Sequence, residues 1–264
     1  GLNLKKIEKI KGLLIRNKNK IISTGPAELI ENLDEIPIPD RGYFNMKYYA
    51  LPRFSSEEDI EPIGTIMTAR GCAFRCRFCS TTSFWRKRIR FFSAKRVADE
   101  IEMLHKKYGY RRIYIYDDLF TLNKARIREI VQELDTRGLK GKIYFSVYGR
   151  ADCFDEEMAS LLNELNVKTI TFGFETGNQR MLNYLKGPGI TVEHGINALR
   201  LSRKYGMTPC GFFMVGSPTE TLADMEDTYN FIKNNCSENF IIYQTIPFPG
   251  TGIWDYAISK NIIK

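Results

Sequence analysis

Residues 63–79 read IGTIMTARGCAFRCRFC, an apolar run that leads directly into three closely spaced cysteines. The run at 63–69 has the residue types of a buried strand. Cys72, Cys76 and Cys79 follow it with the spacing C-x3-C-x2-C. Thiolate sulfur selects zinc or iron–sulfur clusters. We therefore expect a metal site in the loop after this strand.

Five further strand-like runs follow along the chain, at 112–116, 143–147, 169–174, 208–215 and 240–246. Helical patterns lie between most of them. Two show an apolar face, formed by Val97, Ile101, Leu104 and Tyr108 and by Ile127, Ile130, Val131 and Leu134. Further helices are predicted at about 155–165, 192–205 and 221–234 by the same spacing.

Strands that alternate with helices predict βαβ units and a parallel sheet. We count six such units in residues 63–264, whereas a closed eight-unit barrel needs ~250 residues. The predicted fold class is therefore α/β, a partial (β/α)6 TIM-like barrel with an open parallel sheet. Barrel chemistry lies at the carboxyl ends of the strands, so the residues just after each run are the candidates for a site.

Residues 1–62 differ from the rest of the chain. They carry IPIPD at 36–40, Pro52, Pro62 and the acidic run 57–59, with no sustained period beyond a short amphipathic start. We interpret 1–62 as a linker or wrapping segment and 63–264 as the core domain.

Composition excludes several classes of protein. Of the 264 residues, 43% are hydrophobic and 27% are charged, which argues against intrinsic disorder. No apolar run approaches the ~18 residues of a membrane span, and the Lys-rich start is not a secretory signal. The six cysteines in a long chain fit a reducing cytoplasm better than a disulfide framework. Because the chain opens with Gly1, we expect it to be a piece of something longer.

The cysteine spacing also bears on the kind of metal site. A structural zinc site wants four ligands, usually as two separated pairs. No fourth cysteine or histidine lies nearby, since His105 and His194 fall on distant helical stretches. Three thiolates on a [4Fe-4S] cluster would instead leave one iron open to a ligand. Zinc and a chance grouping remain the alternatives.

C-x3-C-x-Phe-C after the first strand of a partial barrel resembles the radical S-adenosylmethionine (SAM) superfamily, over roughly residues 60–250. The resemblance implies that the three cysteines bind three irons and that SAM chelates the fourth. It also implies that the reduced cluster cleaves SAM to methionine and a 5′-deoxyadenosyl radical. Phe78 matches the aromatic residue that packs near the adenine in this family, and ordinary loop packing is its alternative.

The same resemblance suggests SAM contacts after the second and third strands. Asp117 and Asp118 match acidic residues that accept the SAM ammonium, and their alternative is a helix cap or turn. Arg150 follows the third strand and is suited to a carboxylate of SAM or of the substrate. A surface ion pair with Asp152 is its alternative.

Three more contacts are implied farther along. Glu175 resembles the residue that accepts from the ribose hydroxyls, and Lys186 matches loosely a basic residue for the SAM carboxylate. Gly216 lies in a motif similar to the family's adenine contact, where a glycine admits a close approach. The sequence assigns no catalytic residue beyond the cluster ligands.

Several motifs are most similar to the cobalamin-dependent class of this superfamily. They are ETGNQR at 175–180, GSPTET at 216–221 and PFPGT at 247–251, and IENLDEIPIPDR at 30–41 resembles the connector after a cobalamin-binding domain. We therefore expect a radical SAM core that activates a C–H bond for methyl transfer or oxidative cyclisation. Cobalamin would belong to the full-length parent.

The resemblance implies a small-molecule substrate and a reductant such as flavodoxin or ferredoxin. Nucleic acid is not the expected substrate, although the +8 net charge is compatible with RNA. The alternative functions are an iron–sulfur electron-transfer protein and a radical SAM enzyme that modifies RNA. The substrate itself does not follow from the sequence.

Overall fold

The computed structural model describes residues 7–46, 63–236 and 239–263. Its centre is a six-stranded sheet in the order β10-β9-β8-β7-β6-β3, and every neighbouring pair is parallel. The strands are β3 (Ile63–Ile66), β6 (Arg112–Ile115), β7 (Tyr144–Gly149), β8 (Val167–Glu175), β9 (Thr208–Val215) and β10 (Phe240–Gln244). The first and last strands do not pair, which confirms the open partial barrel.

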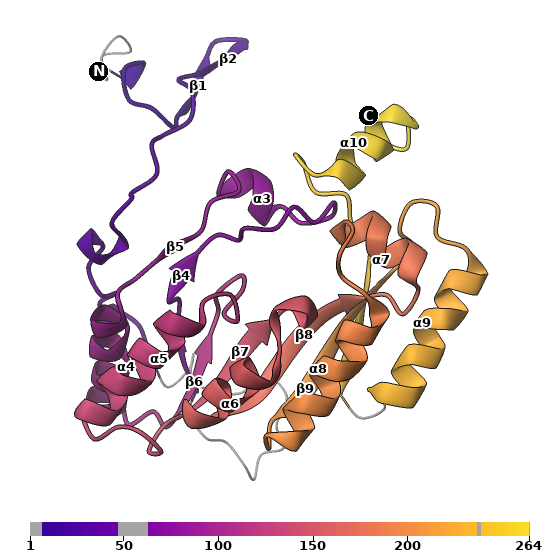
Figure 1. Ribbon diagram of the computed structural model, residues 1–264. Coiled ribbons are helices and arrows are strands. Elements are labelled where there is room, and N and C mark those ends of the chain that lie inside the picture. Colours follow the sequence, from indigo (N-terminus) through magenta and orange to yellow (C-terminus); the bar gives the residue numbers. More distant parts are fainter. Residues whose placement is uncertain (1–6, 47–62, 237–238, 264) are drawn as a thin grey trace.

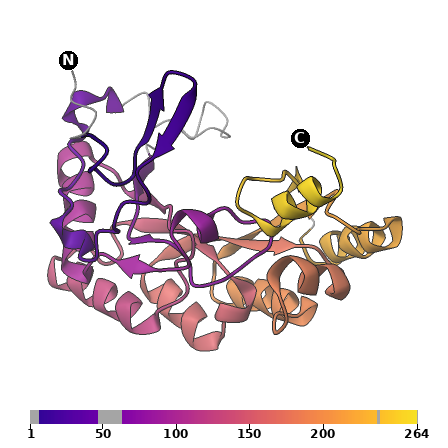
Figure 2. The ribbon, with the colours of Figure 1, turned by 90° about the horizontal axis from the view of Figure 1, so that it is seen from above.

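Five long helices cover one face of the sheet, as Figures 1 and 2 show. They are α4 (Ala94–Tyr108), α5 (Lys124–Thr136), α6 (Glu156–Glu164), α8 (Val192–Lys204) and α9 (Leu222–Asn235). Helices α6, α8 and α9 begin and end within one residue of the predicted ranges, and α4 and α5 contain the two apolar faces that the sequence predicts. Gly109 ends α4 with a left-handed φ of 73°, a conformation that glycine adopts without the steric penalty of a side chain.

The core lies between the sheet and these helices. Ile113, Phe145 and Phe172 point from the strands toward the helices, and each is at most 1% exposed. Ile127 and Ile130 on α5 are buried to the same degree. Alternate strand residues therefore face the helices, while those between them face the opposite, concave side of the sheet.

The concave face carries a row of aromatic rings near the carboxyl ends of the strands. Tyr116 contacts Tyr148 with a ring-centroid distance of 6.0 Å, Tyr148 contacts Phe212 at 6.2 Å, and Phe212 contacts Tyr243 at 5.4 Å. Tyr116 and Tyr243 are about half exposed. Burial raises the pKa of Tyr148 to about 12, so its hydroxyl stays protonated at neutral pH.

Residues 7–46 contain an antiparallel hairpin that the sequence does not predict. It pairs β1 (Leu14–Asn17) with β2 (Lys20–Ser23), and it projects from the barrel in Figure 1. Lys18 in the turn has a φ of 50°. Strands of four residues are too short to show a clear period, and lysine is not a typical residue for that turn.

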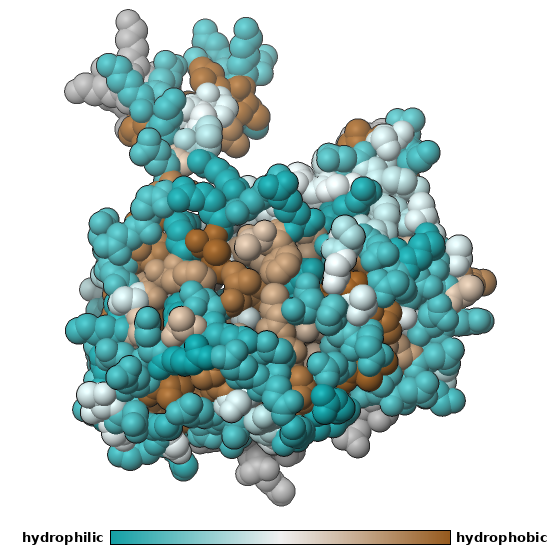
Figure 3. Space-filling view, in the orientation of Figure 1, coloured by the Kyte–Doolittle hydropathy of each residue, from teal (hydrophilic) through white to brown (hydrophobic). Residues whose placement is uncertain are grey.

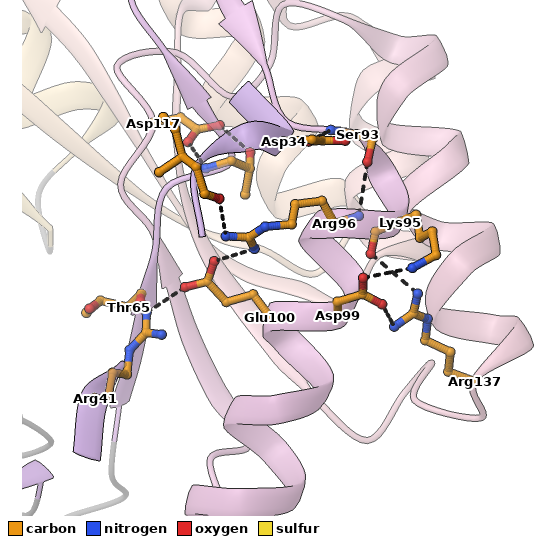
Figure 4. Close-up of polar contacts among 12 residues, drawn as sticks. Asp34, Arg41, Thr65, Ser93, Lys95, Arg96, Asp99, Glu100, Asp117 and Arg137 are labelled. Atoms are coloured by element: carbon orange, nitrogen blue, oxygen red, sulfur yellow. Dashed lines mark hydrogen bonds and ion pairs between the residues drawn. The ribbon is translucent and has the colours of Figure 1, made fainter. Parts of the chain in front are cut away.

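The segment after the hairpin is fastened to the barrel. Asp34 accepts a hydrogen bond from the backbone N–H of Ser93 at 2.9 Å. Arg41 donates to Glu100 at 2.7 Å and to the carbonyl of Thr65 at 2.8 Å. Arg96 binds the other oxygen of Glu100 at 3.1 Å, as Figure 4 shows. Glu100 is 7% exposed, and the two guanidinium groups balance its buried charge.

Part of the predicted linker lies outside the described residues, and the first predicted strand is shorter in the structure. Pro52, Pro62 and the acidic run at 57–59 lie outside the described residues. The first strand ends at Ile66 rather than at residue 69, because residues 69–70 leave the sheet to form the short strand β4 (Ala69–Arg70). No described helix combines the length and apolar character that a membrane crossing requires.

Candidate functional site

The three cysteines lie in a closed loop at the carboxyl end of β3. Strand β4 pairs antiparallel with β5 (Arg90–Phe91), so residues 71–89 form a loop between them, which we call the cysteine loop. It contains the short helix α3 (Thr81–Phe84). Gly71 has a φ of 95°, and a Cβ there would lie 1.9 Å from the carbonyl oxygen of Arg88. Only glycine therefore fits where the loop closes.

Asp117 anchors the chain just before the cysteine loop. It is 2% exposed and accepts hydrogen bonds from the backbone N–H groups of Thr68 at 2.5 Å and Ala69 at 2.9 Å. The Thr68 hydroxyl donates to its second oxygen. Burial raises the pKa of Asp117, while these donors and the buried Arg126 act in the opposite direction. Both oxygens of Asp117 have protein donors, and these contacts fix the chain just before the cysteine loop.

Asp118 points the other way and contacts the loop directly. It accepts a hydrogen bond from Gly71 N at 3.2 Å and another from the Thr81 hydroxyl at 3.0 Å. It also lies near Cys72, where its charge raises the pKa of the thiol, although burial is the main cause of that rise. Strand alternation could have separated the two aspartates, because Asp117 has the parity of the helix-facing Ile115.

Helices α7 (Gln179–Lys186) and α10 (Gly252–Ser259) hold the middle of the cysteine loop. The backbone N–H of Arg77 donates to Leu185 O at 2.7 Å, and Arg77 O accepts from Ile253 N at 3.2 Å. The Arg77 guanidinium lies 4.6 Å from the ring centre of Tyr184. The sequence does not predict either helix. Both matter here because they fix the backbone between Cys76 and Cys79.

Two cations lie near Cys76. Arg150, directly after β7, donates from Nη1 to the Cys76 Sγ at 3.2 Å. Burial raises the pKa of the Cys76 thiol, and the charges of Lys186 and Arg150 oppose that rise. A cysteine that binds metal does so as the thiolate, which nearby cations stabilise. The surroundings of Cys76 therefore favour a metal-binding form.

Glu175 and Lys186 form a buried ion pair beside this cysteine. Lys186 Nζ lies 3.0 Å from Glu175 Oε1 and also donates to the carbonyl oxygen of Gly173. Glu175 is 7% exposed and adopts a φ of 66° at an irregularity of β8. A left-handed conformation is costly for glutamate and is more common at functional sites than elsewhere.

The structure thus brings Arg150, Glu175 and Lys186 together around Cys76. It also places Cys72 near Cys76, Cys79 and Asp118. Phe78 is half-buried within the cysteine loop. Gly216 follows β9 with a φ of 79°, and a Cβ there would meet no atom within 4 Å. The space beside Gly216 is compatible with the predicted close approach of a ligand.

Phe74 and Cys153 also lie at this site, although the cysteine motif predicts no role for Phe74. The Arg150 guanidinium is centred 3.8 Å from the Phe74 ring. Cys153 lies close enough to Cys72 for their charges to interact, and burial raises its pKa to about 11. Both contacts depend on tertiary folding, so no local sequence signal could have revealed them.

A hollow opens beside the cysteine loop, between β5 and the first turns of α5, α6 and α8. Its volume is about 610 Å³, and Phe91, Leu122, Cys153 and Phe154 are among the residues that line it. Figure 3 shows apolar surface inside a recess on this side of the molecule. Asp152 and Cys153, which contact or lie near the site, are the link between the hollow and the cysteines.

The donor set of the cysteine loop fits an iron–sulfur cluster. All six cysteines are free thiols. Cys72 lies near enough to Cys76 and Cys79 for their charges to raise the pKa of its thiol, after burial as the main cause. Three thiolates that each bind a different iron leave the fourth iron of a [4Fe-4S] cluster open.

Comparison with known proteins agrees with this chemistry. A sequence model of the Radical SAM superfamily matches residues 66–232, more than half of the chain. The chain belongs to the radical SAM superfamily. Binding of a [4Fe-4S] cluster and of SAM, and reductive SAM cleavage, are properties of this family, so the chain is a radical SAM enzyme core.

Individual relatives indicate which members of the superfamily the chain is similar to. The chain is 36% identical to an uncharacterized methyltransferase of Pyrococcus horikoshii, over 98% of this chain and 54% of the relative. It is 28% identical to the cytidylyl-2-hydroxyethylphosphonate methyltransferase of Streptomyces wedmorensis, over 88% of this chain and 44% of the relative. It is 32% identical to the anaerobic magnesium-protoporphyrin IX monomethyl ester cyclase of Cereibacter sphaeroides, over 83% and 35% respectively.

Among solved structures, the fold matches the radical SAM methyltransferase TsrM of Kitasatospora setae with cobalamin and a [4Fe-4S] cluster bound. The TM-score is 0.76 at 21% identity, and the match covers 96% of this chain and 49% of TsrM. The chain therefore spans about half or less of the length of the proteins that it matches. The matched proteins include cobalamin-linked members of the superfamily.

Proposed function

We propose that this chain is the core of a cobalamin-linked radical SAM methyltransferase, in which Cys72, Cys76 and Cys79 hold the cluster. The observation that carries the proposal is the environment of Cys76, which lies in a closed loop with Arg150 and Lys186 beside it. When bound, the cluster supplies one electron for the cleavage of SAM. The protein's own side chains position the reactants.

We assign the SAM contacts to residues around that cysteine. Glu175 would accept hydrogen bonds from the ribose hydroxyls, and Lys186 would balance its charge and face the SAM carboxylate. Their buried ion pair supports this assignment, since it holds both charges at the end of β8. Asp118 would accept from the SAM ammonium, while Phe78 and Gly216 would flank the adenine. Arg150 would instead act on the cluster through its contact with Cys76.

Methyl transfer is the chemistry that the relatives favour, because two of the three relatives named above are methyltransferases by name. The cyclase relative makes oxidative cyclisation the second candidate. The row formed by Tyr116, Tyr148, Phe212 and Tyr243 would provide an uncharged wall for a small-molecule substrate. A flavodoxin or ferredoxin would supply the electron.

We further propose that residues 1–62 link the core, residues 63–264, to a cobalamin-binding domain of the whole protein. The contacts of Asp34 and Arg41 support a linker that is fixed to the core at one end. At the other end of the linker, the hairpin projects away from the barrel, which leaves it accessible to a further domain. Free thiols and an oxygen-sensitive cluster suit a reducing cytoplasm.

Anaerobic reconstitution tests the proposal. We expect about four irons per chain, an EPR spectrum of the reduced cluster that SAM alters, and slow formation of 5′-deoxyadenosine. Cys76→Ala should abolish cluster binding and SAM cleavage, whereas Cys236→Ala, at a buried position at the end of α9, should retain both. A cluster whose EPR spectrum does not change with SAM would indicate an electron-transfer protein. Protein that binds zinc and no iron would contradict the assignment of the three cysteines as cluster ligands.

With the whole protein and a substrate, SAM deuterated in its methyl group distinguishes methyl transfer from oxidative cyclisation. A methyltransferase transfers the labelled methyl group to the product, and a cyclase does not. Labelled RNA would instead indicate the RNA-modifying alternative.

A further inference from the structure

Arg150 is held on three sides in an orientation that aims one N–H group at a cysteine sulfur. Its Nε donates to Asp152 Oδ1 at 2.7 Å, and its Nη1 donates to Cys76 Sγ at 3.2 Å. The ring of Phe74 lies against the guanidinium, 3.8 Å from its central carbon. The backbone N–H of Arg150 donates to the Thr121 hydroxyl at 3.3 Å. The side chain therefore has little freedom to turn away from the sulfur.

We propose that Arg150 is a positioning residue that raises the reduction potential of the cluster by donating a hydrogen bond to the Cys76 thiolate. The inference rests on the proposed function, in which Cys76 is a cluster ligand. It departs from the expectation that Arg150 binds a carboxylate of SAM or substrate. Two of its N–H groups are already directed at Asp152 and Cys76.

The physical reason is the charge that reduction adds. A reduced cluster carries one more negative charge, and that charge is spread over the ligand sulfurs. N–H donors to these sulfurs and nearby positive charge stabilise the reduced form, which makes the potential less negative. Arginine stays protonated at any working pH, so it can supply this stabilisation throughout the enzyme's pH range.

Lys186 also lies near Cys76, but its position differs. Its ammonium group is directed at the Glu175 carboxylate and at the carbonyl oxygen of Gly173. Asp152 balances part of the Arg150 charge but leaves the N–H···S contact in place. We therefore expect the directional hydrogen bond of Arg150, more than its net charge, to set the potential.

An EPR-monitored redox titration without SAM tests this inference in the reconstituted protein. Arg150→Met removes both the donor and the charge, Arg150→Gln keeps a neutral donor, and Arg150→Lys keeps the charge without the planar fork. We expect the midpoint potential to shift to more negative values in all three variants, most in Arg150→Met. Arg128→Gln is the control, since Arg128 pairs with Glu157 on the exposed outer surface and should leave the potential unchanged.

The possible results distinguish failure of the proposed function from failure of the proposed role of Arg150. Wild-type protein that binds no cluster would overturn the proposed function itself. Arg150→Met protein with wild-type iron content and an unchanged midpoint potential would overturn only the tuning role. If none of the three variants holds a cluster while circular dichroism shows native folding, the tuning role is also overturned, and Arg150 acts in cluster assembly.

Discussion

Replacement of Asp117 by alanine should destabilise the fold far more than the same change at its neighbour Asp118. Asp117 is 2% exposed and accepts three hydrogen bonds, from two backbone N–H groups and from the Thr68 hydroxyl. Its loss would leave these donors without an acceptor at a cost of ~1–3 kcal/mol each. It would also remove the carboxylate that balances the charge of Arg126, which is 5% exposed.

Removing one partner of a buried charge pair typically costs ~3–5 kcal/mol. Because these contributions overlap, we expect Asp117→Ala to lower the free energy of unfolding by about 3–5 kcal/mol in total. Asp118 is exposed and makes two hydrogen bonds, to Gly71 N and the Thr81 hydroxyl. Asp118→Ala should cost about 1 kcal/mol.

Urea denaturation followed by circular dichroism measures both variants in the reduced protein without cluster. Equal losses of stability, within about 0.5 kcal/mol, would refute the reasoning, because the two carboxylates would then have equivalent surroundings. Iron content after reconstitution gives a second readout. Asp117→Ala should bind less iron, since its contacts fix the chain just before the cysteine loop.

Three more predictions concern other parts of the structure. Gly71→Ala should prevent closure of the cysteine loop and abolish iron binding, whereas Gly109→Ala, whose Cβ meets nothing within 4 Å, should cost only about 1 kcal/mol and bind iron normally. Glu175→Gln should raise the Kd for SAM about tenfold or more in calorimetry of the reconstituted protein, and an unchanged Kd would remove Glu175 from the SAM site. Hydrogen bonds from Thr221, followed by one from Arg180, lower the pKa of Asp224 to about 2. Its stabilisation is therefore complete above pH ~4 and lost as the pH falls toward 2, so Asp224→Asn should flatten the acid denaturation profile in that window.

The sequence predicts the strands and long helices because their signals are local. The apolar spacing of Ile127, Ile130 and Leu134 places three apolar side chains on one face of a helix, and this pattern is visible within a few residues of sequence. The cysteine loop is predictable for a related reason, because the type and spacing of its three ligands are contained in residues 72–79. The place of each loop in the barrel then follows from the rule that parallel strands present their carboxyl ends together.

The contacts within the site do not follow from local signals. Residues 76 and 150 are 74 positions apart, so their hydrogen bond exists only in the folded chain. The left-handed backbone at Glu175 depends on a shift in register between β8 and β9. The opposite orientations of Asp117 and Asp118 follow from strand alternation, whereas the acidic motif alone does not distinguish the two residues.

Strand β10 closes one end of the sheet without a further strand beside it among the described residues. Phe240, Ile241, Ile242 and Tyr243 are each 41–48% exposed, so this edge offers both unpaired backbone groups and apolar side chains. An edge of this kind is a template for intermolecular β-pairing and aggregation. Preparations of the isolated chain should therefore be kept dilute, and a lysine introduced at Ile242 is the simplest change that would improve solubility during purification.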